Sequence, residues 1–145
     1  MQRVDGQFVY AASDLNKFLE CKRLTELDAL AVRKRLEWPD AEEDEQAELI
    51  RRKGEEHEQR YLALLRDRHA GDVVEFGRTE QGIASFRAAD RQTLEAMQRG
   101  PKIIYQATFF DGQFLGHADF LRRVERPSKL GDYSYEVMDT KLALN

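Results

Sequence analysis

Apolar side chains recur at helical spacing through most of the first hundred residues. The clearest case is residues 42–68, where the inward positions are spaced by four, three, four and three residues and so fall on one face of a helix. These positions are Ile50, Gly54, His57, Tyr61 and Leu64. The pattern predicts a long helix with this stripe, His57 included, turned toward the body of the protein.

Three further helices are expected around this long one. Ser13 suits the N-cap of a short helix whose apolar side carries Leu15, Phe18 and Leu19. A second helix is predicted over residues 24–37, ending before Trp38-Pro39 because the residue before a proline disfavours helical backbone. A third covers residues 79–99, after a short strand at 72–76. Its expected inward residues are Phe86, Leu94 and Met97.

The pattern changes to strands after residue 100. Residues 101–111 and 113–124 are rich in β-formers and meet at Asp111-Gly112, a strong hairpin turn signal. A polar loop then leads to a third strand at 135–141. The expected fold class is therefore α/β of the α+β-like kind. One domain over residues 1–145 would contain a mostly helical part, 1–100, followed by a three-stranded catalytic β-meander, 101–145.

Composition narrows the class of protein. The 145 residues suit one domain, and 41% hydrophobic with 34% charged residues is typical of a globular chain. No apolar run approaches the roughly 20 residues of a membrane span, and no signal segment is visible, which favours the cytoplasm. The single cysteine, Cys21, excludes an internal disulfide. A net charge of -4 argues against nucleic-acid binding by the whole surface but leaves room for a local basic patch.

The last predicted strand carries candidate chemistry. Asp139 and Lys141 are two residues apart and therefore share a face of that strand, although both residue types are uncommon in strands. A carboxylate there can bind a hard cation, and the ammonium group can position an attacking water. The alternative is an exposed surface pair at the strand end, and the Asp-x-Lys pattern alone favours that alternative.

Asp119 is the second candidate. It lies among apolar neighbours on the preceding strand, and strands joined by a short loop are usually adjacent, so Asp119 and Asp139 are expected side by side. Two adjacent carboxylates raise one pKa unless a cation neutralises them. The alternative is one hydrogen-bonded and one exposed Asp. His117 shares the Asp119 face but is the weaker candidate.

His57 is the third candidate, because it lies on the inward stripe one helical turn after Gly54. A lone inward histidine is more often a core residue with satisfied hydrogen bonds than a ligand. Glu58 could also face the site, although solvation is its more common fate.

Three motifs occur in order: Gly54-x-x-His57, Gly116-x-x-Asp119 and Asp139-x-Lys141. Together with the opening Ser13-x-Leu15-x-x-Phe18-x-x-Cys21, they resemble the RecB-like branch of the PD-(D/E)xK nuclease superfamily, and in particular a group of uncharacterised RecB-like nucleases. The resemblance covers nearly the whole chain and implies a restriction-endonuclease-like core.

The resemblance also implies a mechanism. His57, Asp119, Asp139 and the backbone carbonyl of Thr140 would bind Mg²⁺ or Mn²⁺, and Lys141 would orient or activate the water nucleophile. The expected activity is metal-dependent hydrolysis of DNA phosphodiester bonds, single- or double-stranded, in DNA repair. A helicase or another repair protein is a further expected partner. Gln106 corresponds to a position where relatives carry an acidic or amide side chain.

The chain departs from the family in two ways. Relatives continue into a helix with Gln-x-x-x-Tyr, whereas this sequence stops at Asn145 before the usual last helix and strand. We expect either a fragment of a longer protein or a truncated form, whose open sheet edge would favour self-association. An iron–sulfur cluster is not supported, because the late cysteines are missing, and Cys21 is expected to be a small core residue. Two alternatives remain: a non-catalytic module that binds DNA or a helicase partner, and a plain α/β scaffold with coincidental motifs.

Overall fold

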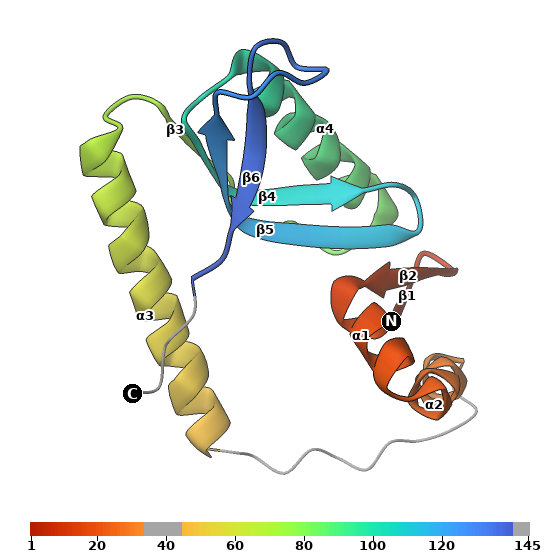
Figure 1. Ribbon diagram of the computed structural model, residues 1–145. Coiled ribbons are helices and arrows are strands. Elements are labelled where there is room, and N and C mark those ends of the chain that lie inside the picture. Colours follow the sequence, from red (N-terminus) through yellow and green to blue (C-terminus); the bar gives the residue numbers. More distant parts are fainter. Residues whose placement is uncertain (34–44, 141–145) are drawn as a thin grey trace. The chain divides into compact units, whose positions relative to one another are not determined.

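The computed structural model describes residues 1–33 and 45–140, and these residues form an α+β fold. They contain four helices and a mixed, open sheet of six strands (Figure 1). The strand order is β1-β2-β5-β4-β3, and β6 also pairs with β5. The elements are β1 (Gln2–Val4), β2 (Gln7–Ala11), α1 (Ala12–Glu20), α2 (Lys22–Val32), α3 (Glu45–Arg68), β3 (Val73–Glu75), α4 (Ile83–Arg99), β4 (Ile103–Phe110), β5 (Phe114–Val124) and β6 (Ser134–Met138).

The described residues group into two compact units. The first comprises residues 1–33, 79–91 and 108–117, and the second comprises residues 45–78, 92–107 and 118–140. α4, β4 and β5 therefore contribute residues to both. Within these residues no helix has the length and apolar character that a membrane crossing requires.

The first unit opens with a β-hairpin that the helical pattern did not predict. β1 and β2 pair antiparallel around Asp5-Gly6, whose φ angles of 48° and 85° are both positive, as a tight two-residue hairpin turn requires. Asp-Gly is the same signal that correctly predicted the turn at Asp111-Gly112. The core of this unit is formed by Val4, Val9, Phe86, Phe110 and Leu115, with Ile83 packed against it.

Helix α1 differs from its prediction in its cap and in its apolar side. Ser13 lies inside the helix. The N-cap is Ala11, and Asp14 accepts a hydrogen bond from its backbone N–H at 2.8 Å. Leu15, Phe18 and Leu19 are exposed, and so is Cys21, which is therefore not a core residue. The predicted helix over 24–37 corresponds to α2, and its predicted end at Trp38-Pro39 lies outside the described residues.

The second unit is built on α3 and on segments of β3, β4, β5 and β6. β3 runs parallel to β4, and β6 runs antiparallel to β5 with Phe120 opposite Met138. The core consists of Leu62, Leu65, Ile103, Tyr105 and Phe120, with Tyr61, Val73 and Met138 packed against it. Phe120 is fully buried, and its ring contacts those of Tyr61 and Tyr105 at centroid distances of 5.3 and 5.1 Å.

The predicted inward face of α3 was wrong by one position. Leu62 and Leu65 are buried, whereas Ile50 and Leu64 are 54% and 61% exposed. The sequence runs Tyr61-Leu62-Ala63-Leu64-Leu65, so two stripes one residue apart are almost equally apolar. The pattern therefore predicted the helix correctly and its rotation incorrectly. A smaller error of the same kind affects α4, where Leu94 is exposed and Thr93 and Ala96 are buried.

Candidate functional site

Asp119 and Asp139 lie together in the second unit, as their places on neighbouring strands predicted. Each is the next residue beyond the Phe120–Met138 pair, Asp119 within β5 and Asp139 just after β6. The Asp119 carboxyl is half-buried. Its pKa is raised to about 6, first by burial, then by a hydrogen bond with Asp139 and by the negative charges of Glu58 and Asp139. Full ionisation of this pair is therefore costly, because burial and like charge both disfavour the ionised Asp119.

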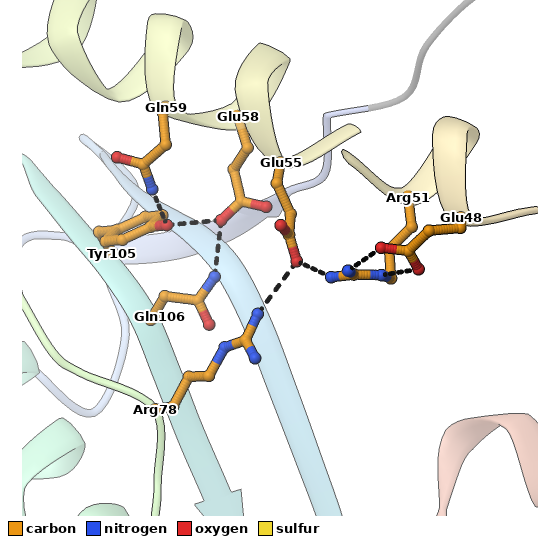
Figure 2. A network of polar contacts seen from close by, with 8 residues as sticks. All are labelled: Glu48, Arg51, Glu55, Glu58, Gln59, Arg78, Tyr105 and Gln106. Atoms are coloured by element: carbon orange, nitrogen blue, oxygen red, sulfur yellow. Dashed lines mark hydrogen bonds and ion pairs between the residues drawn. The ribbon is translucent and has the colours of Figure 1, made fainter. Parts of the chain in front are cut away.

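Glu58 is a further acidic group near Asp119, and the side chains of Tyr105 and Gln106 hold it in place (Figure 2). The Tyr105 hydroxyl donates a hydrogen bond to the Glu58 carboxylate at 2.6 Å, and the Gln106 side-chain amide donates to the same oxygen at 2.7 Å. The Gln59 amide in turn donates to the Tyr105 hydroxyl at 2.9 Å. Burial, followed by the bond to Glu58, raises the pKa of Tyr105 to about 12, so the phenol remains a donor at all physiological pH values.

Gln106 occupies an unusual backbone conformation in the middle of β4. Its φ angle is +57°, a left-handed value that costs a residue with a side chain about 1–2 kcal/mol. The conformation coincides with the hydrogen bond from its amide to Glu58. Strained backbone of this kind concentrates at functional sites.

His57 is not part of this arrangement. Its side chain is exposed on α3, because the helix is rotated by one position relative to the predicted stripe. The next residue, Glu58, is half-buried, and its negative charge is one of the causes that raise the pKa of Asp119. The sequence did contain the signal: Leu62 and Leu65 lie four and seven residues after Glu58, the spacing of one helical face.

The remaining predicted site residues lie in different places. Thr140 is half-buried directly after Asp139, and Lys141 lies outside the described residues. His117 belongs to the first unit, where its Nδ1 is 3.2 Å from the Thr108 hydroxyl. That hydroxyl is in turn 2.9 Å from the Thr79 hydroxyl.

The acidic pair fits a hydrated divalent cation better than a fully protein-bound one. Across residues 1–33 and 45–140, no three His, Cys, Asp or Glu side chains are grouped closely enough to hold a metal ion. Mg²⁺ commonly uses one or two carboxylates and keeps several waters. Asp119 and Asp139 provide those two carboxylates, and burial together with neighbouring negative charge raises the pKa of Asp119. A cation with oxygen ligands suits this donor set.

Basic side chains near β5 and β6 are largely paired with acidic ones. Arg122 and Arg126 contact Glu136 at 3.2 and 3.9 Å, and Lys102 contacts Glu125 at 3.0 Å. Arg123 also contacts Glu125, and its guanidinium stacks on the Tyr133 ring at 4.2 Å. These residues form no unneutralised basic patch, so they add little attraction for nucleic acid beyond what single side chains supply.

Comparison of the chain with protein-family models, with curated proteins and with solved structures gave no match. The resemblance to RecB-like nucleases therefore remains a prediction from three short motifs.

The substitution His57→Ala tests whether His57 belongs to the site. Because the structure leaves this side chain exposed on α3, the substitution should change the cleavage rate little. We expect metal-dependent activity within about twofold of wild type, because the exposed imidazole does not reach the Asp119–Asp139 pair. The measurement is the rate of Mn²⁺-dependent DNA cleavage. A loss of a hundredfold or more would restore His57 as a ligand and would require α3 to rotate when the site binds metal.

Proposed function

We propose that the second unit carries the metal-dependent nuclease site of a RecB-like PD-(D/E)xK enzyme with a restriction-endonuclease-like core. The observation that supports this most directly is the placing of the Asp119 and Asp139 carboxyls side by side, within β5 and just after its partner β6, where burial and neighbouring negative charge raise the pKa of Asp119 to about 6. The substrate is DNA, and the reaction is phosphodiester hydrolysis. DNA repair is the expected setting, with a helicase or repair protein as an expected partner.

Each residue has a stated part in this proposal. Asp119 and Asp139 hold Mg²⁺ or Mn²⁺ through carboxylate oxygens, and the carbonyl of Thr140 is a further oxygen donor next in the chain. When bound, the ion polarises the scissile phosphate and stabilises the charge that develops on it. Lys141 follows in the chain and orients the attacking water. Glu58, fixed by Tyr105 and Gln106, adds a carboxylate near Asp119 and so favours binding of a cation there.

The experiment is cleavage of end-labelled single- and double-stranded DNA by the full chain with Mn²⁺, Mg²⁺, Ca²⁺ or EDTA. We expect cleavage with Mn²⁺ and Mg²⁺ and none with EDTA. DNA binding without cleavage under any of these conditions would reject the enzyme in favour of the non-catalytic binding module.

The third acidic residue has a test of its own. Glu58→Gln keeps the length of the side chain but removes its charge, so it should weaken metal binding. We expect about a tenfold increase in the Mn²⁺ concentration that gives half-maximal cleavage. Glu56→Gln is the matched control, because Glu56 is exposed on the same helix. An unchanged metal requirement in Glu58→Gln would remove Glu58 from the site.

A further inference from the structure

A cavity of about 410 Å³ opens beside Glu58, and all of its lining belongs to the second unit. One wall is α3, with Glu55 and Glu58, and the opposite wall is β4. The segment after β3, with Phe76 and Arg78, closes the third side. Glu58 thus lines this cavity and also lies near the carboxyl pair, because its negative charge helps to raise the pKa of Asp119. A ligand in the cavity would lie next to the proposed metal.

The charges of the lining determine which part of a ligand the cavity accepts. Glu55 and Glu58 contribute two carboxylates, against one guanidinium from Arg78. Arg78 donates to Glu55 at 3.1 Å, its side chain is 87% exposed, and Arg51 also pairs with Glu55, at 2.6 Å (Figure 2). Both guanidinium groups contact Glu55, whereas the Glu58 carboxylate is held by the uncharged Tyr105 and Gln106, so a phosphate placed beside Glu58 would meet negative charge. A neutral ring with N–H donors would meet acceptors, while Arg78 offers an accessible cation for a phosphate outside.

The size and the rings of the lining suit a nucleobase. A volume near 400 Å³ lies at the lower end of the range for small-ligand sites and can hold a single nucleotide. Phe76 and Tyr105 contribute aromatic side chains, and Gln106 contributes an amide. Bases stack on aromatic rings in proteins that bind single strands, and amide and carboxylate oxygens accept hydrogen bonds from the exocyclic amino groups of bases.

We propose that this cavity receives one unpaired, amino-bearing base of single-stranded DNA, with the adjoining phosphate outside at Arg78. The inference rests on the proposed nuclease function and adds a substrate preference to it. A base inside a cavity is necessarily out of the duplex stack, so single strands bind without the cost of unpairing. Oligo(dC) and oligo(dA) bind more tightly than oligo(dT), which lacks an exocyclic amino group.

The sharpest test fills the cavity. A Cβ built at Gly77, which also lines the cavity, meets nothing within 4 Å, so Gly77→Leu adds a bulky side chain to the cavity lining with no clash at its Cβ. Binding is measured by fluorescence anisotropy with labelled oligo(dC), oligo(dT) and a duplex, in Ca²⁺. We expect Gly77→Leu to weaken oligo(dC) binding at least tenfold. Ala63→Leu, an exposed position of α3, is the matched control and should bind as wild type does.

A second variant tests the proposed contact between Arg78 and the phosphate outside the cavity. Arg78→Gln removes the accessible guanidinium and should weaken oligo(dC) and oligo(dT) alike, by about three- to tenfold, with a shallower dependence on salt. Arg60→Gln, whose side chain is 77% exposed on α3, is the charge-matched control.

The outcomes separate this inference from the proposed function. Unchanged oligo(dC) binding in Gly77→Leu overturns the proposal that the cavity receives a base. Equal binding of oligo(dC) and oligo(dT) by the wild-type chain overturns it as well. Mn²⁺-dependent cleavage can persist in either case and would leave the proposed nuclease intact. Selective oligo(dC) binding that Gly77→Leu abolishes, in a chain that never cleaves DNA, would support the cavity and reject the enzyme.

Discussion

Asp139→Asn should abolish Mn²⁺-dependent cleavage of DNA, lowering the rate about a thousandfold, which is about 4 kcal/mol of activation free energy. The substitution keeps the shape of the side chain and removes its charge. Asp139 is exposed just beyond β6, so the change places no new polar group in the core. The loss would come from a cation that the remaining Asp119 carboxylate cannot hold in place alone.

Asp132→Asn makes the same replacement at an exposed position of the loop before β6 and should cleave as wild type does. Thermal unfolding of all three proteins shows whether the folds are equally stable. Cleavage by Asp139→Asn at the wild-type rate would mean either that Asp139 is not a metal ligand or that a contaminating nuclease is present. Column fractions in which activity and protein separate would identify the contaminant.

The sequence predicted the carboxyl pair because the relevant signals are local. Asp111-Gly112 determines one turn, and the apolar runs around Asp119 and before Asp139 mark two strands that pair as neighbours. Adjacency then follows from strand order, and the mutual effect on pKa follows from adjacency. The hairpin at Asp5-Gly6 carries the same Asp-Gly signal, but the residues after it have a helical pattern that favours a helix over a strand.

The sequence pattern favoured His57 over Glu58 as the third site residue because helix rotation is a tertiary property. Tyr61-Leu62 and Leu64-Leu65 offer two nearly equal stripes, and packing against Phe120 and Ile103 decides between them. That choice turns Glu58 toward the site and leaves His57 exposed. The positive φ of Gln106 had no sequence signal, because glutamine is not a residue that favours this conformation.

The carboxyl pair should also make stability depend on pH and on metal. The pKa of Asp119 is about 6 in the folded protein and 3.8 is its ordinary value, so the folded state retains a proton that the unfolded chain releases. This contribution to stability is therefore present below about pH 4, falls between about pH 4 and 6, and is lost above. With solvent screening of the half-buried carboxyl taken into account, the loss is about 1–2 kcal/mol at pH 8.

Asp119→Asn removes the titrating group and should therefore be more stable than wild type by about 1–2 kcal/mol at pH 8 in EDTA, and equally stable at pH 4. Adding Mg²⁺ or Mn²⁺ at pH 8 should stabilise wild type, because binding to the folded state lowers its free energy, and should leave Asp119→Asn unchanged. Urea unfolding at both pH values, with and without metal, measures these differences. Asp132→Asn, the exposed control, should follow wild type in all four conditions. A stability gap between Asp119→Asn and wild type that is the same at pH 4 and pH 8 would show that Asp119 ionises freely beside Asp139, and the argument for a cation there would then fail.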